Sequence, residues 1–191
     1  MPATVLLAAV VVAVAVLQSH PEFRLASAGP STDVVMVVAA GCKGGTDSDF
    51  NGDGYRDTAI ADPKATVNGL ADAGRVSVVY GNVDDLHPDG GLIDVLQQGA
   101  GGIPGGAEAG DEFGHALAVY DANKDGCSDL VVSAPFEDTG AAVDGGAAVV
   151  LFGSPSGLGK GPATIWYDQN APGWGDDNES GDWFGYSLTA G

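Results

Sequence analysis

The chain has 191 residues, with 26 acidic side chains against 7 lysines and arginines and a formal net charge of -19. A nucleic-acid-binding protein needs clustered basic side chains to neutralise phosphates, so this balance excludes that class. Apolar residues make up 45% of the sequence, close to the globular average, so the negative charge does not indicate disorder. The 31 glycines favour short strands joined by tight turns over helices.

The N-terminal segment has the pattern of an export signal. An apolar run from Thr4 to Leu17 is followed by a polar stretch and then by Ala26-Ser-Ala28, the order of a secretory signal peptide. A retained membrane anchor and a buried core element are the alternatives, although a spanning helix needs about 20 apolar residues. We expect a signal peptide at residues 1–28, a secreted or cell-surface protein, and no stable membrane insertion after cleavage.

The sequence then repeats itself. The segment Asp49-Phe-Asn-Gly-Asp-Gly-Tyr-Arg-Asp57 returns 72 residues later as Asp121-Ala-Asn-Lys-Asp-Gly-Cys-Ser-Asp129. A second marker, Glu108-x-Gly-Asp-x-Phe-Gly114, returns 71 residues later as Glu179-x-Gly-Asp-x-Phe-Gly185. A fixed period of this length indicates a repeat architecture. We predict a first repeat at residues 29–100, a second at residues 101–178 and the start of a third at residues 179–191.

Each repeat contains short apolar runs bounded by Gly, Pro and Asp, which is the pattern of strands. In the second repeat the runs predict strands near residues 115–120, 130–133, 147–152 and 163–167, and in the first near residues 34–38, 58–61, 75–80 and 92–96. Four strands in about 70 residues are typical of a propeller blade. We therefore predict an all-β fold, a partial β-propeller of about two four-stranded blades plus the start of a third. A β-sandwich is the alternative, but it does not require the same loop to return at a fixed spacing.

The repeated acidic segments have the ligand spacing of a calcium loop. Oxygen side chains stand at positions 1, 3, 5 and 9, a glycine at position 6 permits the turn, and the main-chain carbonyl at position 7 completes the set. The predicted ligands are Asp49, Asn51, Asp53, Tyr55 (carbonyl) and Asp57 in the first loop, and Asp121, Asn123, Asp125, Cys127 (carbonyl) and Asp129 in the second.

Other interpretations of these loops are weaker. An EF-hand requires Glu at position 12, where this chain has Ile60 and Val132. Magnesium prefers fewer protein ligands and a stricter octahedron, so Ca2+ is the expected cofactor. Asx-turns with solvated carboxylates are the remaining alternative, but they do not require the whole pattern twice.

These residues resemble the FG-GAP repeat, found in the N-terminal β-propeller of integrin α chains and in many secreted bacterial proteins. Phe113-Gly114 is similar to the "FG", Ala134-Pro135 to the end of "GAP", and residues 121–129 to the calcium loop between them. The first repeat differs, with Gly41-Cys42 at the position of the FG. The resemblance implies a seven-bladed propeller with calcium loops between the first two strands of some blades.

No motif of a catalytic site is present. Gly153-Ser-Pro-Ser-Gly157 lacks the spacing of a nucleophile elbow, and none of the 3 histidines has a recognisable partner Ser or Cys. Cys42 and Cys127 permit one disulfide in an exported chain, but spacing alone leaves the bridge open.

We therefore expect a secreted calcium-binding module that acts in binding or adhesion without catalysis of its own, with an extracellular protein or glycan as its partner. The alternative is the non-catalytic propeller portion of an exported hydrolase, of the esterase or phospholipase type, whose active site lies outside this chain. Closed propellers have about four to eight blades. We therefore expect either further blades in a longer chain or self-association of several chains.

Overall fold

The computed structural model describes residues 23–24, 35–36, 42, 47–83, 93–173 and 176–190, and the chain divides into two compact units, Met1–Ala40 and Gly41–Gly191. In the first unit, β1 (Phe23–Arg24) pairs antiparallel with β2 (Val35–Met36). β2 lies within the strand predicted near residues 34–38, but it pairs with β1 and not with β3, so its predicted place as the first strand of the first blade is not observed. Apart from β1, the expected signal peptide lies outside the described residues.

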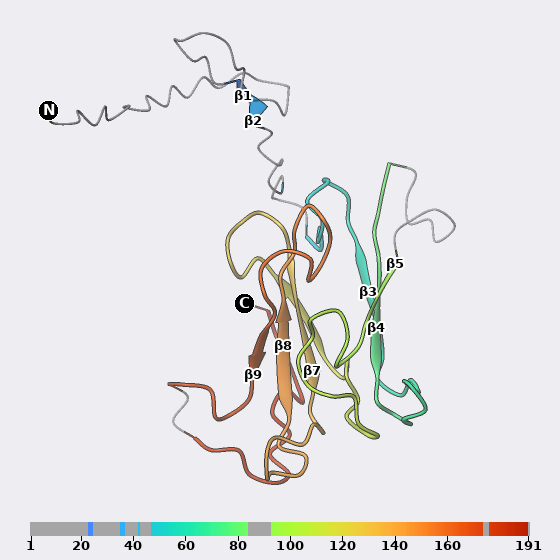
Figure 1. Cartoon of the computed structure of the whole chain (residues 1–191), viewed down its shortest axis with the longest axis vertical. Coiled ribbons are helices and arrows are strands. Elements are labelled where there is room, and N and C mark those ends of the chain that lie inside the picture. Colours follow the sequence, from blue (N-terminus) through green and yellow to red (C-terminus); the bar gives the residue numbers. More distant parts are fainter. Residues whose placement is uncertain are drawn as a thin grey trace, which may run out of the picture. The chain divides into compact units, whose positions relative to one another are not determined.

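The second unit consists of two antiparallel sheets (Figure 1). Sheet 1 has the order β3 (Thr58–Asp62), β4 (Arg75–Val79) and β5 (Ile93–Leu96). Sheet 2 has the order β6 (Leu117–Tyr120), β7 (Asp129–Ala134), β8 (Ala147–Leu151) and β9 (Ile165–Tyr167). Among the described residues there is no helix, and so no helix long and apolar enough to cross a membrane. The all-β fold of a partial propeller is confirmed.

The two sheets follow the sequence repeat in their hydrogen-bond register. Ala61 pairs with Val76 in sheet 1, and the residues 72 positions later, Ser133 and Ala148, pair in sheet 2. The last strand is shifted by one residue, since Val76 pairs with Leu96 whereas Ala148 pairs with Tyr167. The distance in sequence between equivalent residues of the two repeats therefore changes from 72 to 71 between β8 and β9, before the second marker at residues 179–185.

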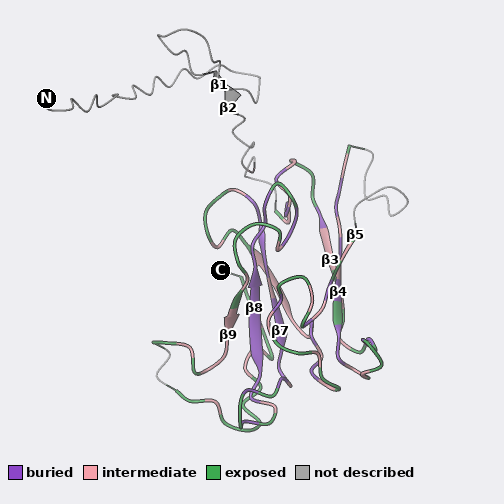
Figure 2. Cartoon of the chain, in the orientation of Figure 1, coloured by how far each residue is buried: buried purple, intermediate pink, exposed green. Residues whose placement is uncertain are grey.

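One hydrophobic core lies between the sheets, because strands expose alternate side chains on opposite faces. The core face of sheet 1 carries Ala59, Ala61, Val76, Val78 and Leu96, and the core face of sheet 2 carries Leu117, Val119, Leu130, Val132, Val149, Leu151 and Trp166. Strands β7 and β8 are almost wholly buried, as the purple ribbon shows (Figure 2). Each fully buried aliphatic side chain contributes about 1.5–3 kcal/mol.

The Phe-Gly markers dock onto the preceding sheet in the same way twice. Backbone N–H groups of Glu112 and Phe113 donate to the carbonyls of Asp72 and Ala73 beside sheet 1 (both 3.0 Å). Trp183 and Phe184 make the equivalent bonds, of 3.2 and 3.0 Å, beside sheet 2 to residues 144 and 145. Gly74 lies against this contact with a φ of 84°, which only glycine adopts freely.

Candidate functional site

The two acidic loops lie at corresponding places in the sheets. Residues 49–57 lead directly into β3, and residues 121–129 connect β6 to β7. Each loop ends on an aspartate at the start of a strand, so the strand fixes the last side chain of its loop. The structure places all the sequence-predicted ligand residues in these two loops.

In the first loop the side chains hold the backbone in a tight coil. The two Asp49 carboxylate oxygens accept N–H bonds from Gly52 (2.7 Å) and Gly54 (2.9 Å). Asn51 Oδ1 accepts from the Asp53 N–H (3.0 Å), and Asp53 Oδ1 accepts from the Tyr55 N–H (2.8 Å). These bonds are Asx-turns, in which a side-chain oxygen replaces a backbone acceptor.

The second loop repeats nearly the same network. Asp121 accepts N–H bonds from Asp125 (3.2 Å) and Gly126 (3.1 Å), and Asn123 Oδ1 accepts from Asp125 (3.0 Å). Asp125 Oδ1 accepts from the Cys127 N–H at 2.8 Å. The two segments share the spaced Asp and Asn side chains and the glycine at position 6, and they adopt nearly the same conformation.

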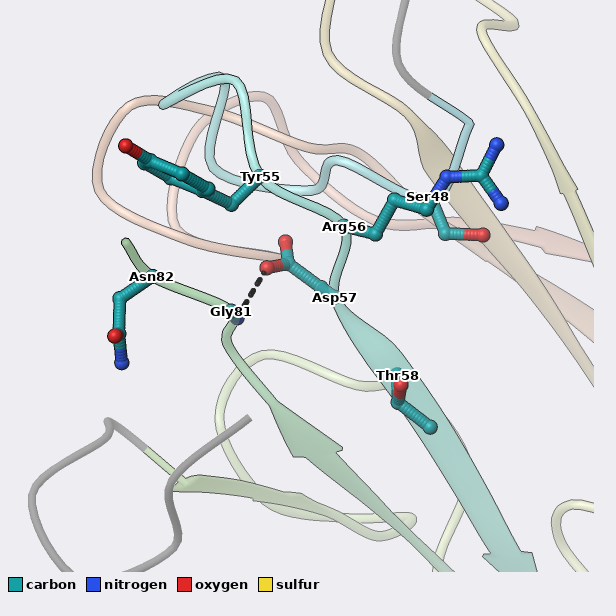
Figure 3. Close-up of a pocket in the computed structure, with 7 residues that line it drawn as sticks. All are labelled: Ser48, Tyr55, Arg56, Asp57, Thr58, Gly81 and Asn82. Carbon is teal, nitrogen blue, oxygen red and sulfur yellow. Dashed lines mark hydrogen bonds between the residues drawn. The ribbon is translucent and has the colours of Figure 1, made fainter. Parts of the chain in front are cut away.

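The ninth residue of each loop ties the loop to the next strand connection. Asp57 Oδ2 accepts the Phe50 N–H (2.7 Å) and its Oδ1 accepts the Gly81 N–H (2.8 Å), which follows β4 (Figure 3). Asp129 makes the corresponding bonds to Ala122 (2.7 Å) and Gly153 (2.8 Å). These glycines were not predicted as part of the site, although both lie in the sequence repeat.

The environment of these aspartates favours a cation. Burial raises the pKa of the Asp57 carboxyl to about 6, and the negative charges of Asp49 and Asp53 act in the same direction, while N–H bonds oppose them. Burial likewise raises the pKa of Asp129. The adjacent Arg56 side chain offers no compensation, because it pairs with Asp47 (3.4 Å) and extends away from the Asp57 carboxylate in Figure 3.

The donor set fits calcium in its chemistry. Each loop offers only oxygen ligands, and a carboxylate oxygen that accepts one N–H retains a second lone pair for a metal. Among the described residues, only Cys42, Asp125 and Cys127 form a group of three possible ligands whose ligand atoms all lie within 4.8 Å of one another. In neither loop, therefore, do the three carboxylates lie that close together.

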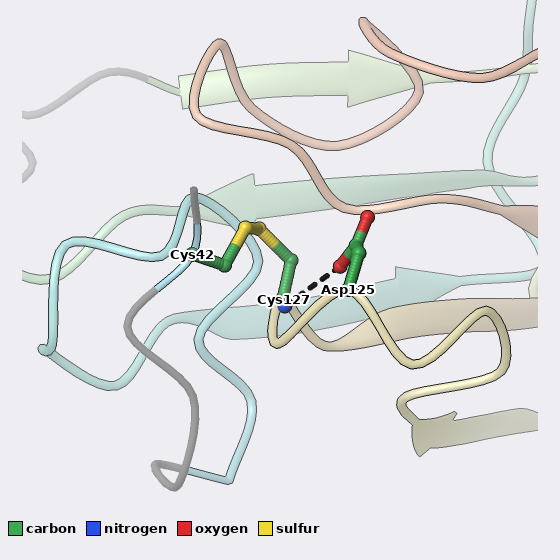
Figure 4. A group of neighbouring side chains, drawn as sticks. All are labelled: Cys42, Asp125 and Cys127. Carbon is green, nitrogen blue, oxygen red and sulfur yellow. Dashed lines mark hydrogen bonds between the residues drawn. A yellow bond between two sulfur atoms is a disulfide. The ribbon is translucent and has the colours of Figure 1, made fainter. Parts of the chain in front are cut away.

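That group of three is not itself a metal site, because the two sulfurs are bonded to each other. Cys42 and Cys127 form a disulfide with a Cα–Cα distance of 5.0 Å, beside the Asp125 carboxylate (Figure 4). The bridge that the sequence left open is thus present, and it fastens the approach to the first loop onto the second. The Cys127 carbonyl, which is the predicted ligand, is not consumed by the bridge.

A buried acidic pair near the docked marker was missed from the sequence. Glu137 is 6% exposed, and Gln98 Nε2 donates to its Oε2 at 2.5 Å. Burial raises the pKa of Glu137 to about 8 and that of Asp111 to about 6. The residue 72 positions before Glu137 is Ala65, so no repeated pattern could have identified this pair.

Comparison with known proteins identifies related sequences. The family model of the FG-GAP repeat matches residues 113–151. The phosphatidylinositol-glycan-specific phospholipase D of Rattus norvegicus is 39% identical over 111 residues, which are 58% of this chain and 13% of that protein. The enzyme of the same name from Dictyostelium discoideum is 34% identical over 92 residues, or 46% of this chain and 10% of that protein.

The chain thus spans only a small part of the length of these relatives. The family match begins at the docked Phe113, includes the second acidic loop and ends with β8. The chain therefore contains an FG-GAP repeat, matched at residues 113–151, and has the fold of a partial β-propeller.

Proposed function

We propose that the two sheets form a calcium-binding propeller module that binds a partner and performs no catalysis itself. The observation that carries this proposal is the pair of acidic loops with one hydrogen-bond network. Asp49, Asn51, Asp53, the Tyr55 carbonyl and Asp57 would hold one ion, and the equivalent five groups of the second loop another. When bound, a calcium ion would offset two of the three negative charges that the carboxylates of each loop carry.

Calcium in this role is structural. Each loop leads into a strand, and its ninth residue is hydrogen-bonded to the glycine that follows the next strand, so a cation there stiffens the end of the sheet. An ion that binds only the folded state adds stability by mass action. The interaction surface of such a module consists of loops carried by the rigid sheets.

Thermal unfolding tests this role. We expect millimolar calcium to raise the melting temperature of the purified chain, and equal magnesium to raise it much less, because magnesium requires an octahedron that these loops do not favour. The same unfolding temperature in calcium, magnesium and chelator would contradict the proposal.

A second candidate role is favoured by the relatives named above. We propose that the module is the non-catalytic propeller portion of an exported phospholipase of that type, with the active site outside these residues. Its support is the 39% identity over 111 residues. The test is incubation of the purified chain with a phosphatidylinositol-glycan-anchored protein: no release is expected, and metal-dependent release by this chain alone would contradict the proposal.

A further inference from the structure

The two acidic loops are joined directly to each other by backbone hydrogen bonds. The Ser128 N–H of the second loop donates to the Asp49 carbonyl of the first at 2.8 Å, and the Ser154 N–H donates to the Phe50 carbonyl at 3.0 Å. Asp49 is 1% exposed and Phe50 is fully buried, so these bonds are shielded from water. The start of the first loop is therefore held by the end of the second loop and by the connection that follows β8.

These bonds lie next to predicted calcium ligands in both loops. Asp49 is the predicted ligand at position 1 of the first loop. Ser128 stands between the predicted ligands at positions 7 and 9 of the second loop, which are the Cys127 carbonyl and Asp129. The Cys127 N–H also donates to Oδ1 of Asp125, the predicted ligand at position 5, at 2.8 Å. A shift of the ligands in either loop therefore alters the contact between the loops.

The disulfide adds a covalent link at the same place. Figure 4 shows the bridge from Cys127, in the second loop, to Cys42. Cys42 in turn packs against Gly52, which is position 4 of the first loop. A Cβ on Gly52 would lie 2.5 Å from Cys42 Cα and 2.8 Å from Cys42 Sγ, closer than side-chain atoms approach. The bridge is thus bonded to one loop and packed tightly on the other.

A difference between the two repeats supports this role of the bridge. Position 4 is Gly52 in the first loop and Lys124 in the second, although both residues have a positive φ, of 69° and 62°. The backbone conformation alone therefore does not require glycine at this position. Glycine is required in the first loop because Cys42 occupies the space into which a side chain would extend. The first loop thus has the residue that contact with the bridge demands.

Contact of this kind couples binding at two sites. An ion fixes the loop that binds it, and the fixed loop restrains its neighbour through the bridge and the backbone bonds. The neighbouring loop then loses less conformational entropy when it binds its own ion, which gives positive coupling. Electrostatics alone would act in the opposite direction, because each calcium ion reduces the negative potential that attracts the next one. Positive coupling therefore reports on the contact between the loops and not on their charge.

We propose that the Cys42–Cys127 disulfide and the bond between Ser128 and Asp49 couple the two acidic loops, so that a calcium ion in one loop raises the calcium affinity of the other. The inference rests on the proposed calcium binding and adds that the two sites act as a pair. Coupling between sites is reciprocal and typically changes affinity by about 5- to 150-fold. Breaking the contact between the loops should remove this factor without removing either set of ligands.

Calorimetric calcium titration of three chains measures the coupling. Asp53→Ala leaves the second site and Asp125→Ala leaves the first, so each variant gives the association constant of one loop while its neighbour is empty. The product of the two stepwise constants of the wild type equals the product of these single-site constants multiplied by the coupling factor. We expect a factor of about 5 or more. A factor of one or below would overturn the coupling and leave the proposed calcium binding intact, whereas no calcium binding by the wild type would overturn both.

Two further changes test whether the contact carries the coupling. Replacing Cys42 and Cys127 by Ser removes the bridge, and Gly52→Ala keeps the bridge but pushes it off the first loop. Each change, combined with the same single-site substitutions, should bring the factor close to one. The matched control is Lys124→Ala, which places alanine at the same position of the second loop, where the side chain is exposed, and should leave the factor unchanged. Circular dichroism verifies that each variant is folded. A factor that persists in both changes, or that the control abolishes equally, would overturn the role of the contact.

Discussion

Replacing the buried Glu137 by Gln should make the stability of the protein less dependent on pH. Burial raises the pKa of Glu137 from 4.5 to about 8, and the charges of Asp111 and Glu108 act in the same direction. In the unfolded chain this carboxyl loses its proton near pH 4.5, but in the folded chain it loses it near pH 8. The folded state therefore binds more protons between these values, and the free energy of unfolding falls as pH rises.

The magnitude follows from the same values. One pKa unit corresponds to about 1.4 kcal/mol, so the rise from 4.5 to about 8 lowers the free energy of unfolding by at most roughly 5 kcal/mol across this range. Gln has nearly the shape of a protonated Glu and can accept the Gln98 bond while donating to Asp111. The variant should match the wild type near pH 4.5 and be several kcal/mol more stable near pH 8.5.

Urea denaturation from pH 4.5 to 8.5, at a fixed excess of calcium, measures this difference. The matched control is Glu179→Gln, the same substitution at an exposed carboxylate of the third repeat, which should change the free energy of unfolding by less than about 0.5 kcal/mol at every pH. A difference between the wild type and Glu137→Gln that is independent of pH would refute the reasoning.

The remaining predictions concern two structural contacts. Replacing Cys42 and Cys127 by Ser should lower the free energy of unfolding by about 4 kcal/mol, because the bridge spans 85 residues, and an unchanged chemical denaturation midpoint would contradict this. Gly74→Ala should lower the free energy of unfolding by about 3 kcal/mol or more, because a Cβ there meets the Phe113 backbone. Gly69→Ala should lower it by only about 1–2 kcal/mol, because its Cβ meets no atom and only the positive φ is unfavourable. Equal melting temperatures for the two alanine variants would show that the contact at Gly74 is not tight.

Much of the fold could be predicted because the sequence repeats its spacing. The predicted strands near residues 58–61, 75–80, 130–133 and 147–152 match β3, β4, β7 and β8 to within one or two residues at each end. Glycines and aspartates bound these apolar runs, so local sequence determines where they end. The run at residues 34–38 does contain a strand, β2, but its pairing partner β1 was not predicted, because an apolar run does not identify its partner.

The candidate site, like the fold, could be predicted from the sequence only in part. The loop residues were found because an alternating set of oxygen side chains is visible in sequence, and their role as calcium ligands stays a prediction. The Gly81 and Gly153 N–H groups that hold the ninth residues lie 24 positions away, where only the fold brings them near. The sequence did not identify Glu137 as a buried residue, because a single acidic residue is normally exposed and the burial of Glu137 depends on contact between the two sheets.

Calcium titration by calorimetry tests the central claim, that the repeated acidic loops are metal sites of a propeller module. The wild-type chain should bind two calcium ions, one per loop, in preference to magnesium. Asp53→Ala or Asp125→Ala alone should remove one site each, and the double variant should bind none while keeping the strand content of the wild type. Two sites that persist in the folded double variant, or no calcium binding by the wild type, would contradict the account.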